Sequence, residues 1–164
     1  MATWSQAFAA QAGSDLDAFL TVEASGLPIS YRLHYLQMWL EKLCKAYLWL
    51  PGAGVAELQF KHNVVASVLP NLISKHRRRI GAEDLKDLKA IRELCREIDL
   101  LHPQVDDLGR RRDNVEYPWA GISGAIEVPA QWKFTLAERL YTNPGRLLRK
   151  AAVIFTRNAS EIIR

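Results

Sequence analysis

Apolar residues recur every three or four positions between Pro28 and Tyr47, and this spacing constrains the fold more than any other feature of the chain. The row consists of Ile29, Leu33, Leu36, Leu40, Leu43 and Tyr47. Such a period places the row on one face of an α-helix, and Pro suits the start of a helix because its missing N–H would have no partner there. A second apolar row lies beside the first and consists of Tyr31, Tyr35, Met38 and Trp39. The predicted helix is therefore either the centre of a bundle or half of an interface.

Other stretches of the chain share this helical period, and together they predict an all-α fold, a helical bundle of about five main helices. The expected helices cover residues 14–25, 28–47, 64–73, 84–101 and 132–163. Ser14 is the expected cap of the first helix, Gly26 its end, and Pro70 a kink in the third. With 164 residues, 49% of them hydrophobic, the chain is expected to form one domain over 1–164.

The stretch 103–129 has no helical period and contains several glycines and prolines. Long loops in compact domains are usually functional or carry short strands of their own. We therefore expect an irregular arm here, with a small β-hairpin over 122–128.

Charge, cysteine content and apolar runs indicate the compartment of the protein but do not indicate its activity. The net charge is +4 and the pI is near 9.2, a mild basic excess. Cys44 and Cys95 both lie within helical apolar patterns, which predicts two buried reduced thiols. The chain has neither a secretory signal nor the run of roughly 18 apolar residues that a membrane span needs. These features predict a cytoplasmic protein without a membrane contact.

Arg110, Arg111 and Arg112 form the densest basic segment, and Tyr117 and Trp119 follow closely. Guanidinium groups bind phosphate oxygens through paired donors, and aromatic rings stack on nucleic acid bases. The segment is thus a candidate RNA or nucleotide site. The alternative is a solvated turn, in which the arginines pair with nearby aspartates and the aromatic rings cover an edge of the core.

A second basic cluster, which includes Arg77 and Arg78, ends the third expected helix. Cations are favourable at a helix C-terminus whatever the function, because that end carries partial negative charge. If both clusters share one face, they form a continuous positive surface for RNA.

Polar residues within the second expected helix have two interpretations. His34, Gln37 and Glu41 are placed on one side, either as a structural hydrogen-bond network or as a polar site at a dimer seam. The structural reading is favoured. No metal site and no cofactor are expected, because His62 and His102 are far apart in sequence and no metal-ligand spacing occurs.

Two segments give the chain a resemblance to a known family. The helix reads Leu36-Gln37-Met38-x-x-Glu41-Lys42-Leu43-x-Lys45-Ala46, and Lys61-His62-Asn63-Val64-Val65 opens a later helix. This order resembles the HEPN domain superfamily over roughly residues 14–119. The resemblance implies a helical bundle of a bacterial defence or toxin–antitoxin module that dimerises through its central helices. Catalytic members of the superfamily are metal-independent ribonucleases with an Arg followed four to six residues later by a His.

In this chain Arg112 matches the arginine of that motif, but Tyr117 stands where the histidine is expected. A phenol is a weaker general base than imidazole at neutral pH. The expected function is therefore a binding or association component of a defence module, with a homodimer through Tyr31, Tyr35, Met38 and Trp39 and a cognate protein partner. Arg110, Arg111, Arg77 and Arg78 are the expected RNA or nucleotide contacts. The alternative is a metal-independent ribonuclease that uses Arg112, Tyr117 and a histidine from elsewhere, such as His62 or His102.

Overall fold

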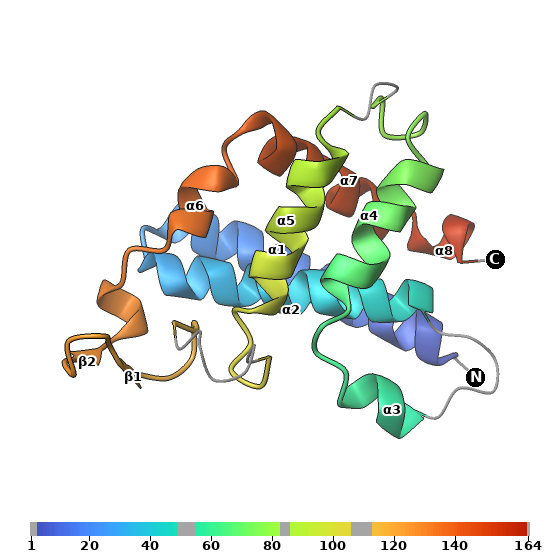
Figure 1. The fold of residues 1–164 in the computed structure, drawn as a ribbon. Coiled ribbons are helices and arrows are strands. Elements are labelled where there is room, and N and C mark those ends of the chain that lie inside the picture. The colour runs from blue at the N-terminus through green and yellow to red at the C-terminus, as the bar shows by residue number, and fades with distance from the viewer. Residues whose placement is uncertain (1–2, 49–54, 83–85, 106–112, 164) are drawn as a thin grey trace.

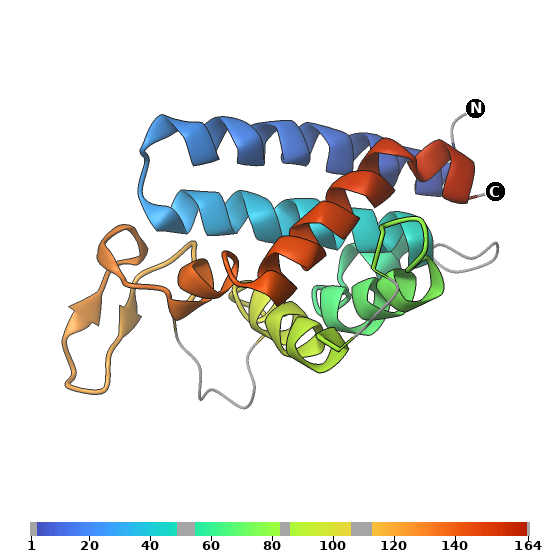
Figure 2. The same cartoon turned by 90° about the horizontal axis from the view of Figure 1, so that it is seen from above.

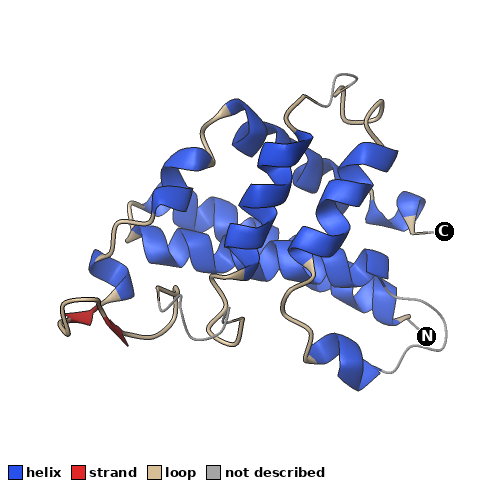
Figure 3. Cartoon of the chain, in the orientation of Figure 1, coloured by secondary structure: helices blue, strands red, loops and turns tan. Residues whose placement is uncertain are grey.

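The computed structural model describes residues 3–48, 55–82, 86–105 and 113–163, which are almost entirely helical (Figure 1). The α-helices in this part of the chain are α1 (Trp4–Ser25), α2 (Ile29–Leu48), α3 (Val55–Gln59), α4 (Val65–Lys75), α5 (Leu88–Asp99), α6 (Thr135–Arg139), α7 (Asn143–Arg157) and α8 (Ala159–Ile162). A two-stranded hairpin, β1 (Trp119–Ala120) and β2 (Ile126–Glu127), precedes a 3-10 turn at Pro129–Gln131. The hairpin is the only sheet among these residues (Figure 3), so the predicted all-α bundle with a small β arm is confirmed.

Helix α2 is the centre of the bundle. It pairs with α1, while α4 and α5 pack on its other side and α7 crosses both α1 and α2 (Figure 2). The middle of its predicted apolar row is buried in this packing, since Leu33, Leu36, Leu40 and Leu43 are each 0% exposed, while Ile29 and Tyr47 at its ends are partly buried. The periodicity alone therefore located the longest stretch of the core.

Trp39 requires a correction, because it was expected to face a second subunit. Its side chain is 0% exposed within the single chain. The indole Nε1 donates a hydrogen bond of 2.8 Å to Thr156 Oγ1 in α7, and the ring lies 5.6 Å from that of Phe19 in α1. The residue is thus a core contact between three helices of one subunit.

The remaining residues of the second row are more accessible. Tyr31 is 50% exposed, while Tyr35 and Met38 are half-buried. These three residues are all that is left of the predicted dimer face.

The first helix begins earlier than predicted, at Trp4 rather than near Ser14. Thr3 and Gln6 form a reciprocal capping box, in which each side chain bonds the backbone N–H of the other residue. Gly26 ends the helix in the left-handed conformation, with φ of 72°, as its sequence position indicated.

Helices α4 and α5 are joined by an acidic side chain at the end of α5. Asp99 is 3% exposed and accepts hydrogen bonds from the backbone N–H groups of Val65 (3.0 Å) and Ala66 (2.9 Å). It therefore caps the N-terminus of α4, which has no side-chain cap of its own. Pro70 lies inside α4 as predicted, and α5 begins later than the predicted residue 84. The short helix α3 had no counterpart in the prediction.

The arm places its strands slightly differently from the expected 122–128. Trp119 pairs with Glu127 and Ala120 with Ile126, so the intervening residues form the turn. Trp119 also contacts Trp132 edge to face at 5.3 Å, which attaches the hairpin to the segment after it.

Cys44 and Cys95 are buried free thiols, as predicted. Burial raises the pKa of both, so both are protonated at neutral pH. Among the described helices, none has the length and apolar character that a bilayer crossing requires.

Candidate polar site beneath the central helix

A buried carboxylate organises one face of α2. Glu41 is 2% exposed and accepts hydrogen bonds of 2.7 Å from Gln37 Nε2 and from Lys45 Nζ. The three residues are four positions apart, so they lie above one another on the helix surface. Of the structural network predicted for His34, Gln37 and Glu41, the bond between Gln37 and Glu41 is present, whereas His34 lies near Glu116 instead.

Electrostatics keep Glu41 ionised despite its burial. Burial by itself raises the pKa of a carboxyl group, but the hydrogen bond from Lys45 and the neighbouring Lys42, Lys45 and His62 outweigh it. The pKa of Glu41 consequently lies below its usual value. The site therefore contains a fixed negative charge at neutral pH.

His62 brings an imidazole to this carboxylate from the segment between α3 and α4. Its Nδ1 lies 3.3 Å from Glu41 Oε2, the oxygen that also binds Gln37. An ionised carboxylate only accepts hydrogen bonds, so Nδ1 carries the hydrogen. In the neutral form of the ring the opposite nitrogen, Nε2, presents a lone pair, which is the arrangement of an oriented general base.

His102 stacks on His62 from the segment after α5. The ring centroids are 3.8 Å apart and the planes differ by 9°. Burial lowers the pKa of His102, and the adjacent His62 lowers it further, so the neutral ring is favoured. Because the backbone N–H of Gln104 donates to His102 Nδ1 at 3.2 Å, the hydrogen of the neutral ring is assigned to Nε2.

His62, on which His102 stacks, lines an open hollow. This hollow, called here the His62 hollow, has a volume of ≈ 710 Å³ and is lined by Ala56, Glu57, Phe60, Lys61, His62, Asn63, Gln104 and Val105. Lys61 gives it an exposed positive charge, and Phe60 gives it an exposed aromatic ring. It is large enough for a ligand of nucleotide size.

The expectation that no metal ligands converge needs correction. Glu41, His62 and His102 each offer a ligand atom, and these atoms lie within 4.8 Å of one another. Two histidines and a glutamate also form a known zinc ligand set. Their arrangement fits an ion poorly, however, because a lone pair lies in the plane of its ring and two nearly parallel stacked rings do not aim at one point. The hydrogen bonds already made by Glu41 and by His102 Nδ1 compete with coordination as well.

A second hollow lies further along the same face of α2. This Tyr117 hollow has a volume of ≈ 400 Å³ and is lined by Ser30, Tyr31, His34, Val115, Glu116, Tyr117, Pro118, Val128, Pro129 and Ala130. His34 Nδ1 and Glu116 Oε1 approach to 3.7 Å there. Tyr117 is 61% exposed, so its ring is available to a ligand.

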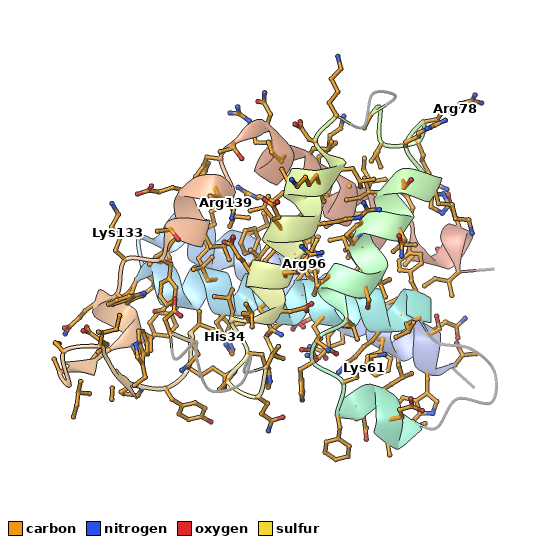
Figure 4. All side chains as sticks on the ribbon, in the orientation of Figure 1. His34, Lys61, Arg78, Arg96, Lys133 and Arg139 are labelled. Atoms are coloured by element: carbon orange, nitrogen blue, oxygen red, sulfur yellow. The ribbon has the colours of Figure 1, made fainter. Side chains whose placement is uncertain are left out.

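Only some of the residues that the sequence grouped as an RNA site belong to the described part of the chain. Tyr117 lines the second hollow, whereas Arg110, Arg111 and Arg112 lie outside the described residues. Arg77 and Arg78 are exposed, but they follow the C-terminus of α4, away from Lys61 and His34 (Figure 4). The predicted positive surface that joins Arg77 and Arg78 to Arg110, Arg111 and Arg112 falls partly outside the described residues and stays a prediction.

Sequence reasoning identified parts of the polar site without joining them. Gln37, Glu41, Lys45 and His62 all belong to the segments that carry the HEPN resemblance. The stacking of His62 on His102 is a tertiary contact, and no spacing in the sequence encodes it.

The fold and the site together define an all-α bundle with an oriented carboxylate–histidine pair. Comparisons with protein-family models, curated proteins and solved structures found no match for this chain.

Proposed function

We propose that this protein is a HEPN-like domain that binds single-stranded RNA beneath α2 and cleaves it without a metal ion. The observation that carries the proposal is the hydrogen bond between Glu41 and His62, with His102 stacked on His62 beside an open hollow. A carboxylate, an oriented imidazole and a neutral donor are sufficient for general acid–base catalysis. The proposal moves the reaction away from the predicted Arg112 and Tyr117 to the histidine pair.

His62 is the general base in this mechanism. Its Nε2 takes the proton of a ribose 2′-hydroxyl, and the 2′ oxygen forms a bond to the adjacent phosphorus. The bond between phosphorus and the 5′ oxygen breaks, and that oxygen takes a proton from solvent water. The resulting hydroxide takes the proton held on His62 Nε2, which restores the neutral imidazole. The products are a 2′,3′-cyclic phosphate and a 5′-hydroxyl end.

Glu41 and His102 support this step from two sides. Glu41 fixes the orientation of His62 and stabilises the imidazolium that forms when the proton arrives. His102 donates its Nε2–H to a phosphoryl oxygen as negative charge builds up there. Lys61 adds a positive charge at the same hollow, which favours binding of the phosphate backbone.

A second function, protein association, is supported by the apolar surface of the arm. Ile122 is 111% exposed, and Ile126 and Val128 are 77% and 36% exposed. Exposed apolar groups of this kind fit a cognate protein partner of a defence or toxin–antitoxin module. A homodimer through Tyr31, Tyr35 and Met38 stays a prediction of the sequence and competes with any ligand for the exposed ring of Tyr31.

The ribonuclease activity is tested by incubating the protein with tRNA and total RNA in EDTA. We expect cleavage with 2′,3′-cyclic phosphate ends, and a loss of rate of about 100-fold or more in His62→Gln. His76→Gln is the matched control, because His76 is at the end of α4 and packs on Phe155.

Intact RNA at a large excess of wild-type protein would refute the activity. Cleavage that needs a divalent cation would refute the metal-independent mechanism. Loss of cleavage in Arg112→Ala, together with full activity in His62→Gln, would return the reaction to the arginine segment.

A further inference from the structure

We infer that the Tyr117 hollow binds one unpaired nucleobase of the RNA, stacked against Tyr31 and Tyr117. This inference rests on the proposed function for the identity of the ligand. It adds a base-binding subsite to the reaction centre and thereby selects single-stranded RNA.

The two aromatic rings come from different elements but line one hollow. Tyr31 is in the first turn of α2, and Tyr117 precedes the hairpin. Their side chains are 50% and 61% exposed, so both retain free ring surface. Stacking of bases on exposed tyrosines is the usual way in which proteins hold single-stranded nucleic acid.

The backbone holds Tyr117 in place before a ligand arrives. Asn114 Oδ1 accepts hydrogen bonds from the N–H groups of Glu116 (2.9 Å) and Tyr117 (2.7 Å). Val115, which follows Asn114, is 8% exposed and anchors the turn in the core. A ring presented by an anchored turn loses little conformational entropy on binding.

The hollow also contains polar groups suited to the edge of a base. Glu116 accepts hydrogen bonds from base N–H groups, and His34, 3.7 Å from that carboxylate, either donates to or accepts from a ring nitrogen or carbonyl. Pro118 and Pro129 add apolar walls. A flat apolar ring with a polar edge fits this combination, whereas a phosphate group is disfavoured by the Glu116 carboxylate.

The Tyr117 hollow lies along the same face of α2 as Glu41. His34 and Glu41 are seven residues apart on α2, which is about two helical turns, or roughly 10 Å. Burial and His62 lower the pKa of His102, and the negative charge of Glu116 opposes that lowering. Glu116 therefore lies near His102. Figure 4 shows His34 and Lys61 along the same lower edge of the molecule. One strand can therefore place a base in the Tyr117 hollow and a phosphate near the histidine pair.

Binding of a five-nucleotide RNA with 2′-fluoro riboses tests the inference without cleavage, because the nucleophile is absent. The second probe is the same chain without its bases, which has equal charge. We expect the wild type to bind the first probe at least about 10-fold more tightly than the second. Tyr31→Ala and Tyr117→Ala should each weaken binding of the first probe by about 5- to 100-fold and leave the second unchanged.

Two further variants control for unfolding and for general aromatic contact. Tyr117→Phe retains the ring and should bind as the wild type does. Trp4→Ala removes a ring that is 45% exposed in the first turn of α1, far from the arm (Figure 1), and should also have no effect. Circular dichroism checks that each variant is folded.

Several results would overturn the inference. Equal affinity of the wild type for both probes, or no binding of either, excludes a base subsite. Wild-type affinity in both alanine variants shows that these tyrosines do not bind a base. If native RNA is still cleaved, the base subsite is refuted and the ribonuclease activity is not. Light scattering that shows a dimer which Tyr31→Ala dissociates would assign the tyrosine to an interface between two copies. Conversely, base-dependent binding without any cleavage would keep the subsite and refute the ribonuclease.

Discussion

At the scale of single residues, the polar site depends on the charge of Glu41. The carboxylate and the Lys45 ammonium are both buried, and each is the other's direct partner at 2.7 Å. Burying two charges is costly, and only good geometry and further hydrogen bonds offset that cost. Gln37 and His62 provide those further bonds to the carboxylate.

We predict that Glu41→Gln lowers the free energy of unfolding by about 3–5 kcal/mol, because the Lys45 charge then remains buried without a counter-charge. Urea denaturation measures the change. The double variant Glu41→Gln/Lys45→Met should recover part of the loss, since it removes the stranded charge. Lys133→Ala is the control, because its partner pair with Glu138 is 83% and 69% exposed and should change stability by less than about 0.5 kcal/mol. An equally small effect of Glu41→Gln would show that the buried pair does not contribute to stability.

At the scale of elements, Asp99 links two helices through a cap. Asp99 is the last residue of α5, and its carboxylate accepts hydrogen bonds from the first N–H groups of α4, the helix that follows His62. Burial raises the pKa of Asp99 to about 6, and the two N–H bonds oppose that rise only in part. The link between α4 and α5 is therefore sensitive to pH.

We predict that this carboxyl group makes the fold less stable as pH rises from 5 to 7. The folded pKa is about 6 and the unfolded value is 3.8, so the folded state binds the proton more strongly. The stability contributed by that proton is fully present below pH 3.8 and is lost as pH rises through 6. Between pH 5 and 7 the loss is about 1 kcal/mol.

Chemical denaturation of the wild type and of Asp99→Asn at pH 5 and pH 7 isolates this contribution. Asp99→Asn should lack this pH-dependent contribution. His102 titrates in the opposite direction in both proteins, so its effect cancels when their unfolding free energies are subtracted. Glu41 does not interfere, because its folded pKa lies below the usual value of 4.5. The stability that its charge contributes is therefore lost only at a pH lower than the range measured. Identical pH dependence in both proteins would contradict the raised pKa of Asp99.

At the scale of the whole molecule, Trp39 shows how the bundle closes on itself. It contacts α1 through Phe19 and α7 through Thr156, which is 117 residues away, so both ends of the chain meet the central helix at one side chain. The same helix leaves Tyr31 exposed at its N-terminal end, beside the arm. The core and the proposed base-binding hollow are therefore neighbours on α2.

We predict that Trp39→Phe lowers the free energy of unfolding by about 1–3 kcal/mol, because it loses a buried hydrogen bond and leaves a small cavity. Its molar mass in light scattering should equal that of the wild type, because the side chain is inside one subunit. A change of oligomeric state without a loss of stability would instead support the original prediction of an interface residue.

Particular residues show which features of the fold could be predicted from the sequence. The period of Leu33, Leu36, Leu40 and Leu43 predicted a buried helix correctly, and the end of α1 at Gly26 followed from turn chemistry. The start of α1 was wrong because the capping pair Thr3 and Gln6 was overlooked. The assignment of Trp39 was wrong because periodicity shows that a face is apolar but not what covers it.

The sequence by itself determined the fold class, the central helix and the placing of Gln37 and Glu41 on one side of it, since these depend on residues within one or two helical turns. Only the tertiary structure decided that His62 and His102 stack beside Glu41 and that Tyr31 and Tyr117 share a hollow. Each of these pairs joins segments that are far apart in the chain. Such contacts are set by how the helices pack around α2, and helix packing depends on the shape of the whole core rather than on local spacing.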